Sequence, residues 1–321
     1  MSISDELTVV SIFPGSMSFS YEYKSYHFNP EYRLVSIKLL KYTLMMTKFM
    51  ENIWYGWLKR PYKLFKSHDH GQGQGIVLLH GLGRSGRVWL EVQKLLENGI
   101  LPCRVVTYDL LGFGQSPKPT SINYDVDDHA QAVIHQLKQL KGGQPVILVG
   151  HSMGSLVAVR VAKLRPDLVK HLVLYEMPLY EGLPKSWHYR TRINLYFKLY
   201  DWIIKQNPSF DEVKKRLSER LTTKVVGTDI SADTWQPFIK SLKNTIMSQS
   251  ADTDLPTLTM PADIIYGSRD MLVIKGKVKE TLGLDSNLVT THTIRERHII
   301  SKQASAFIVE RIDAALKLDS I

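Results

Sequence analysis

The chain has 321 residues, of which 44% are hydrophobic and 22% are charged. These values are ordinary for a globular protein, exclude a collagen, a coiled coil or a disordered chain, and suit one large α/β domain with an insertion. The single cysteine, Cys103, excludes an intramolecular disulfide framework and a cysteine-rich zinc site. The net charge of +10 is compatible with anionic partners. No run of five basic residues marks a nucleic-acid-binding arm, so we expect no nucleic acid partner.

The N-terminal part of the chain differs in pattern from the remainder. Residues 1–30 are rich in aromatic residues and serine without a clear period, and we expect them to be poorly ordered. Asp5 and Glu6, with no early lysine or arginine, do not make the basic start of a signal peptide. No uncharged apolar stretch reaches the roughly 18 residues of a membrane span. These features predict a cytoplasmic protein, with a helical segment and lead-in at 31–75.

An amphipathic helix is predicted within 34–60. Three of its lysines share one helical stripe: Lys38, Lys41 and Lys48. Trp54 and Trp57 lie on the apolar part of the helix surface, outside this stripe. The pattern favours a helix that packs on the domain core with its lysines in solvent. Peripheral contact with an anionic membrane surface stays open as the alternative.

From residue 76, apolar runs that are typical of buried strands alternate with helical stretches. The predicted strands are Ile76–Leu79, Arg104–Tyr108, Val146–Val149, Leu172–Tyr175, Asp263–Tyr266 and Leu288–Thr291. The predicted helices are 87–97, 125–141, 153–164, 275–282 and 301–317. The alternation indicates an α/β fold with a mostly parallel central sheet flanked by helices. It stops at 178–258, where helical periodicity predicts a helical subdomain inserted between two late strands. The core is therefore expected at 76–177 and 259–321.

A short glycine-flanked motif, Gly150-His151-Ser152-Met153-Gly154, follows one predicted strand and precedes a helix. The pattern G-x-S-x-G is weak alone, but this context matches the sharp turn that exposes a nucleophilic serine. Side chains at the first and last positions of such a turn would collide with their neighbours, which explains the two glycines. The N-terminus of the following helix favours developing negative charge beside Ser152.

Several motifs, in this order, resemble those of the α/β-hydrolase superfamily over about 75–320. They are the strand-end loop Leu78–Gly83, the D-x-x-G-x-G-x-S segment Asp109–Ser116, the nucleophile elbow Gly150–Gly154, the strand-then-acid segment Tyr266–Asp270, and His298. The resemblance implies an α/β-hydrolase fold and a serine hydrolase similar to esterases and lipases, without cofactor or metal. It also implies that 178–258 is a cap. Trp187 and Tyr196 in this cap are expected to contact the substrate and to favour an apolar acyl group.

A serine hydroxyl needs an adjacent base, and the base needs a carboxylate. His298 lies between the last strand and the final helix, where it can reach back over the sheet edge. His292 falls inside the strand pattern and is interpreted as structural. Asp270 is preferred as the acid because its loop is the usual origin of the acid in similar proteins, and Glu176, at the end of the preceding strand, is the alternative. One departure from the resemblance is the flank Arg295-Glu296-Arg297, where relatives carry a small residue.

The oxyanion that forms on acyl attack needs two preorganised donors. The backbone N–H groups of Met153 and Leu82 are expected to supply them. His80 is expected to fix the loop that carries Leu82 by hydrogen bonding.

Two other patterns favour different chemistry. Gly81–Gly86 is formally G-x-G-x-x-G, with Asp109 23 residues beyond it, which would suit an NAD-binding oxidoreductase. That alternative leaves the ordered Ser152, Asp270 and His298 unexplained. His68-Asp69-His70 could hold a metal but is interpreted as a loop.

The predicted reaction is therefore hydrolysis of a carboxylic ester or related acyl bond in a small molecule. The elbow does not separate this from carbon–carbon hydrolase, thioesterase, lactonase, perhydrolase or acyltransferase chemistry, because the cap selects the substrate.

Overall fold

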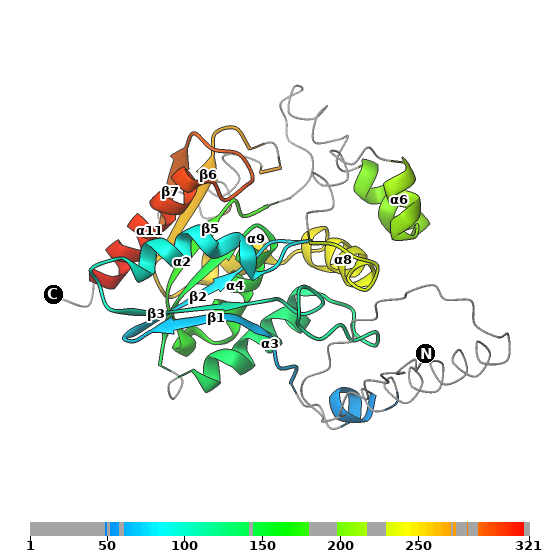
Figure 1. The fold of residues 1–321 in the computed structure, drawn as a ribbon, viewed down its shortest axis with the longest axis horizontal. Helices are drawn as coiled ribbons and strands as arrows, with labels where there is room; N and C mark the ends of the chain where they lie inside the picture. The colour runs from blue at the N-terminus through cyan, green and yellow to red at the C-terminus, as the bar shows by residue number, and fades with distance from the viewer. Residues whose placement is uncertain are drawn as a thin grey trace, which may run out of the picture.

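A computed structural model of the chain describes residues 49, 52–57, 61–140, 144–179, 198–216, 229–270, 272–273, 281 and 288–317. Its centre is a seven-stranded sheet with the strand order β1-β3-β2-β4-β5-β6-β7 (Figure 1). The strands are β1 Lys66–Gly71, β2 Gln74–Leu79, β3 Cys103–Tyr108, β4 Val146–His151, β5 Val169–Tyr175, β6 Ala262–Gly267 and β7 Val289–Ile294. All neighbouring strands are parallel except the antiparallel pair β1–β3. The prediction of a mostly parallel α/β sheet is confirmed.

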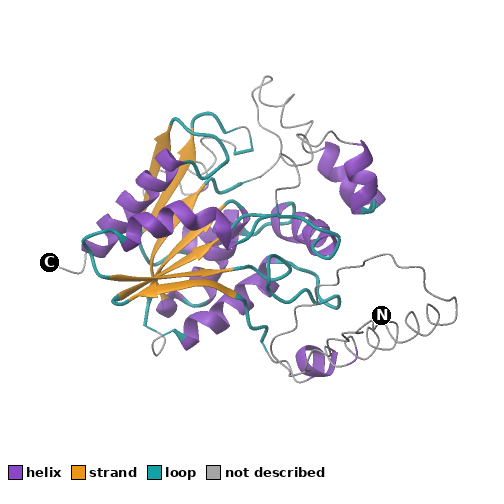
Figure 2. Cartoon of the chain, in the orientation of Figure 1, coloured by secondary structure: helices purple, strands orange, loops and turns teal. Residues whose placement is uncertain are grey.

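Helices cover both faces of the sheet (Figure 2). On one face lie α2 (Leu90–Glu97) and α11 (Lys302–Lys317), and on the other lie α3 (Val126–Gln139) and α4 (Met153–Leu164). Short helical turns occupy η2 (Gly86–Trp89) and η4 (Pro166–Leu168). The start of α3 is set by a reciprocal cap, in which the carboxyl of Asp125 accepts from the Asp128 N–H and the carboxyl of Asp128 accepts from the Asp125 N–H.

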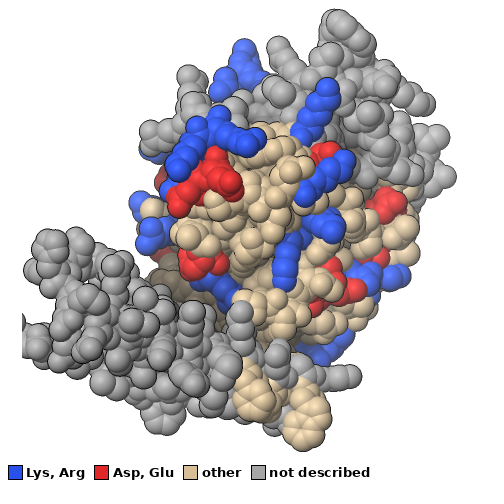
Figure 3. All heavy atoms as spheres, turned by 90° about the vertical axis from the view of Figure 1, so that its right-hand side faces the viewer, with Lys and Arg blue, Asp and Glu red and all other residues tan. Residues whose placement is uncertain are grey.

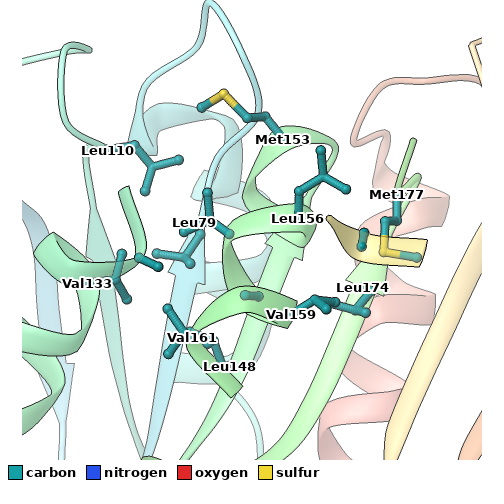
Figure 4. Close-up of a cluster of buried hydrophobic side chains, with 14 of the residues drawn as sticks. Leu79, Leu110, Val133, Leu148, Met153, Leu156, Val159, Val161, Leu174 and Met177 are labelled. Atoms are coloured by element: carbon teal, nitrogen blue, oxygen red, sulfur yellow. The ribbon is translucent and has the colours of Figure 1, made fainter. Parts of the chain in front are cut away.

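Burial on both faces follows from the alternation of side chains along each strand. On β2, Ile76 and Leu78 belong to the cluster beneath α2 and α11, while Val77 and Leu79 belong to the cluster beneath α3 and α4. In this second cluster, strand residues such as Leu79 and Leu148 meet residues of α3 and α4 (Figure 4). The continuous apolar runs of the sequence are thus the signature of strands that are covered on both sides.

The edge strand β1 corrects one prediction. His68–His70 was expected in a loop, but it lies in β1 and pairs with Val105–Thr107 of β3. Most residues of β1 are exposed, so the strand lacks the apolar pattern by which the other strands are recognised. Arg104 Nε donates to Asp69 Oδ1 at 2.7 Å, and His68 Nε2 lies 2.6 Å from Glu97 Oε1.

The described parts of the insertion are helical. They contain a helix at 198–206, α6 (Phe210–Arg216), α8 (Trp235–Ser241), η5 (Leu242–Ile246), α9 (Ala251–Asp254) and η6 (Leu255–Thr257), and no strand. In Figure 1, α6 and α8 lie to the right of the sheet. The Thr245 hydroxyl donates to the Tyr124 carbonyl at 2.8 Å, which fastens η5 to the start of α3. The predicted helix at 275–282 and the segment 1–30 lie outside the described residues, apart from position 281.

Two surface properties bear on possible partners. In the described part of the chain, no helix has the length and apolar character needed to cross a membrane. On the face shown in Figure 3, acidic residues lie among the lysines and arginines, so the described positive charge there does not form one uninterrupted patch.

Candidate active site

The elbow between β4 and α4 holds Ser152 in a strained backbone conformation, with φ 53° and ψ −119°. A Cβ atom at Gly150 would lie 2.5 Å from the Gly154 carbonyl oxygen, and one at Gly154 would lie 2.4 Å from the Leu79 carbonyl oxygen. Both positions therefore require glycine. The Ser152 N–H donates to the Tyr175 carbonyl at 2.9 Å, which anchors the turn to β5. This support compensates strain on the order of 1–3 kcal/mol.

Ser152, His298 and Asp270 lie in one hydrogen-bonded chain. His298 Nε2 lies 2.9 Å from Ser152 Oγ, and His298 Nδ1 lies 2.6 Å from Asp270 Oδ2. A carboxylate only accepts, so Nδ1 carries the proton and Nε2 is free to accept from the serine hydroxyl. The arrangement can deprotonate the hydroxyl and stabilise the imidazolium that results.

Asp270 is charged in this setting. Its side chain is fully buried, and burial opposes ionisation. Attraction to His298 and hydrogen bonds from His298, Glu176 and the Leu272 N–H outweigh burial and lower the pKa of Asp270 to about 2. The Leu272 N–H donates to Oδ1 at 2.7 Å, which leaves Oδ2 facing the imidazole.

The sheet brings these residues together because the carboxyl ends of parallel strands share one edge. Ser152 follows β4, Asp270 follows β6 and His298 follows β7. The Arg269 N–H donates to the Glu296 carbonyl at 2.9 Å, which joins the loops of the acid and the base. The unusual Arg295-Glu296-Arg297 flank thus makes its contact through the backbone.

Glu176 reaches the same site from β5 but contacts different groups. Its Oε1 accepts from the Gly267 N–H at 2.7 Å, and its carboxyl lies beside Asp270, with their ligating atoms within 4.8 Å of one another. The imidazole Nδ1 of His298 bonds Asp270, the acid that the sequence favoured over Glu176.

The loop after β2 approaches the serine closely. A Cβ atom at Gly81 would lie 3.0 Å from Ser152 Cβ. His80 is fully buried, and its Nδ1 and Nε2 lie 2.8 Å from the Gly81 carbonyl and the Leu110 N–H respectively. Burial lowers the pKa of His80, and the neutral ring can donate once and accept once. The ring therefore ties the loop that carries Leu82 to the segment after β3. Met153, the other expected donor, begins α4, where backbone N–H groups have no partner within the helix.

Asp109 binds the protein backbone rather than presenting a free carboxylate. It is 3% exposed, Oδ1 accepts from the Gly86 N–H at 2.7 Å, and Oδ2 accepts from the Gln115 N–H at 2.8 Å. In a dinucleotide site, the acidic residue would instead bond a ribose hydroxyl. Here it joins two loops beside the elbow.

Two aromatic neighbours of His298 were not predicted. The His151 ring lies 5.3 Å from the His298 ring and stacks on Tyr175 at 5.6 Å. Burial lowers the pKa of His151 well below its usual range, so this ring is neutral beside the base. The Tyr175 hydroxyl bonds backbone carbonyls on both sides of His298. The position of Tyr175 at the end of the strand next to the elbow is the one sequence signal that could have identified it.

Other predicted site features fall elsewhere. Trp187 and Tyr196 lie outside the described residues. His292 bonds Asp263 within the sheet at 2.6 Å, as a structural residue would. Among the described residues, Glu176, Asp270 and His298 bring potential metal-ligand atoms within 4.8 Å of one another. Both ring nitrogens of His298 are, however, bonded to Asp270 and Ser152.

Comparisons with known proteins agree with this architecture. Residues 75–195 match the family described as alpha/beta hydrolase fold. A pimeloyl-[acyl-carrier protein] methyl ester esterase of Pseudoalteromonas atlantica is 32% identical over 209 residues, which cover 62% of this chain and 70% of that protein. A 2-hydroxymuconate semialdehyde hydrolase of Pseudomonas is 30% identical over 158 residues, and the match spans only 48% of that relative.

A solved structure gives the same fold. A thermophilic esterase of Thermogutta terrifontis superposes with a TM-score of 0.57 at 19% identity, covering 78% of this chain and 93% of that one. The chain belongs to the α/β-hydrolase family, and the family resemblance predicted from the motifs is confirmed.

Proposed function

We propose that the protein is a serine hydrolase that cleaves a carboxylic ester or a related acyl bond through a covalent acyl-enzyme. The 2.9 Å contact between His298 Nε2 and Ser152 Oγ, with Asp270 on the opposite ring nitrogen, is the observation that carries the proposal. Ser152 is the nucleophile, His298 the base and then the acid, and Asp270 the orienting carboxylate.

In the first half-reaction, Ser152 Oγ attacks the acyl carbon while His298 Nε2 takes the hydroxyl proton. The imidazolium then gives this proton to the leaving alcohol, and the acyl group stays on Ser152. In the second half, His298 deprotonates water, which attacks the ester carbon. The proton returns to Ser152, and the acid is released. The backbone N–H groups of Leu82 and Met153 stabilise the oxyanion in both steps.

The substrate class is a small molecule with an apolar acyl group. This follows from the aromatic residues of the insertion, among which Trp187 and Tyr196 are the proposed contacts. The esterase from Pseudoalteromonas atlantica supports ester chemistry. We also propose a cytoplasmic location, with peripheral contact at an anionic membrane through 34–60 as the alternative.

A second reaction, hydrolysis of a carbon–carbon bond, is favoured by one observation. One relative, the 2-hydroxymuconate semialdehyde hydrolase, has a name that describes a non-ester substrate. The same serine, histidine and acid would serve, because the chemistry differs in the bond presented to them.

Covalent labelling tests the proposal without knowledge of the substrate. A fluorophosphonate probe should add to the wild-type protein at Ser152 and should not add to Ser152→Ala. A panel of p-nitrophenyl esters of graded chain length should show turnover that falls on the order of 10⁶-fold in Ser152→Ala. Labelling at another residue, or none, would count against the proposal. Turnover of a vinylogous diketone with no turnover of any ester would move the assignment to carbon–carbon hydrolysis.

A further inference from the structure

Glu176 is a fully buried carboxyl group at the end of β5, next to the proposed acid. Its backbone has φ 51°, in the left-handed region that glycine and asparagine normally occupy. The Glu176 N–H donates to the Ile265 carbonyl at 2.9 Å, which holds this conformation against β6. A charged residue type in a strained, completely buried position requires a specific set of partners.

The side chain of Glu176 lies against the end of β6 and the loop of the acid. Oε1 accepts from the Gly267 N–H at 2.7 Å. The loop leaves room for this contact only because position 267 is glycine, since a Cβ atom there would lie 2.3 Å from Oε1. The second neighbour is the carboxyl group of Asp270, which lies beside that of Glu176 in the same buried site. Ligating atoms of these two residues and of His298 lie within 4.8 Å of one another.

Two ionised carboxyl groups this close in a buried site repel each other, so one of them carries a proton. Asp270 accepts from the Leu272 N–H and faces the imidazole N–H, so its environment is built for negative charge. Among the described contacts, Glu176 accepts one backbone N–H and faces Asp270. The proton therefore belongs to Glu176, and its O–H can serve as a hydrogen-bond donor to the Asp270 carboxylate.

We propose that Glu176 is a positioning residue, held as a neutral carboxylic acid, that donates to Asp270 and so fixes the carboxylate that orients His298. The proposal rests on the proposed function, because it gives Asp270 and His298 their roles there. By withdrawing charge from Asp270, the donated hydrogen bond also makes His298 easier to deprotonate at a given pH.

The other titratable groups around Glu176 fit a neutral partner. The phenols of Tyr175 and Tyr266 belong to β5 and β6 beside it, and burial raises the pKa of each. Glu296 and Asp270 act on Tyr175 in the same direction. No cation among these groups would stabilise a second negative charge beside Asp270.

The test measures the rate at which a fluorophosphonate labels Ser152 between pH 4 and 9. Three proteins are compared: wild type, Glu176→Gln and Glu176→Leu. Glutamine keeps a donor for Asp270 and an acceptor for Gly267 but cannot ionise. Leucine removes the donor and excludes water that could replace it. Circular dichroism and the melting temperature of each variant show how much protein is folded.

The proposal expects Glu176→Gln to label like wild type, with an unchanged midpoint of the pH profile. It expects Glu176→Leu to move the acidic limb upward by about one pH unit, because Asp270 loses a donor and holds the imidazolium more strongly. If Glu176 were ionised, glutamine would remove a negative charge about 5 Å from the imidazole and lower the midpoint by about two pH units. That result overturns the proposal.

Two further outcomes separate the possible failures. A slower Glu176→Leu with an unmoved midpoint would make Glu176 a packing residue and also overturn the proposal. If leucine prevents folding, the glutamine variant alone decides the charge state, which is the central claim. A wild-type protein that is not labelled at Ser152 refutes the proposed function, whereas a labelled wild type with the wrong variant pattern refutes only the role of Glu176.

Discussion

The hydroxyl of Tyr175 lies 2.9 Å from the carbonyl oxygen of Ile299, and 3.0 Å from that of Arg297. The single proton of this hydroxyl is shared between the carbonyls on either side of His298. The carbonyl of Tyr175 also accepts from the Ser152 N–H at 2.9 Å. One residue therefore holds the backbone of both the nucleophile and the base.

Tyr175→Phe should lower kcat by about 10-fold through a small displacement of His298. The ring still stacks on His151, so the free energy of unfolding should fall by only about 1 kcal/mol for the lost hydrogen bonds. Ester turnover and urea unfolding measure the two effects. A loss of stability without loss of turnover would show that the loop holds His298 without this hydroxyl.

Asp270→Asn should lower kcat roughly 10⁴-fold, because an amide no longer selects the tautomer that leaves Nε2 free. His298→Ala should cost at least as much. Both proteins should retain the wild-type fold by circular dichroism. If Asp270→Asn keeps near-full turnover and Glu176→Gln does not, the acid of the triad is Glu176.

We expect Asp263 to make a pH-dependent contribution to the free energy of unfolding. Its carboxyl oxygens bond His171 Nε2 at 2.8 Å and His292 Nε2 at 2.6 Å. Burial raises the pKa of Asp263, but the bonds from His171 and His292 outweigh burial and lower it below the usual 3.8. A folded-state pKa below the unfolded value means that the stabilisation is present above pH 3.8 and is lost as the pH falls through the folded value.

Asp263→Asn should therefore reduce the free energy of unfolding at pH 7 by about 1–3 kcal/mol. The gap from wild type should shrink as the pH falls below 3.8. Urea unfolding between pH 7 and 3 measures it, with the exposed Asp211→Asn as control. A gap that stays constant over this range would contradict the role of the carboxylate charge.

The segment 34–60 offers a test of contact with lipid. Its lysines lie outside the described residues, but Trp57 is 80% exposed and Phe49 is 57% exposed, so neither side chain is packed into the core. The favoured packing of the helix on the core predicts no binding to anionic vesicles, whereas contact with lipid predicts co-sedimentation at low salt, at about 1 kcal/mol for each lysine near the surface. High salt, or glutamine at Lys38, Lys41 and Lys48 together, should weaken it. No binding at low salt would leave helix packing as the explanation of the amphipathic pattern.

Local sequence determined the elbow and most of the sheet. The five mostly buried strands, β2 to β6, are recognisable because their apolar runs reflect burial, whatever the neighbours are. The glycines at 150 and 154 are predictable because the atoms that a Cβ would meet belong to the same turn or to the adjoining strand. The order of Ser152, Asp270 and His298 likewise follows from motifs that each span a few residues.

The tertiary structure decided the features that depend on contacts between distant residues. The exposed strand β1 exists because β3 offers its backbone hydrogen bonds, and exposed side chains leave no apolar pattern. Asp270 and Glu176 each follow a strand, and only the packed loops show that the imidazole meets Asp270. Glu176 and Gly267 are 91 residues apart in sequence, and only the fold brings them within hydrogen-bond distance. Hydrogen bonds act over about 3 Å in space, so a pairing across neighbouring strand ends has no signal along the chain.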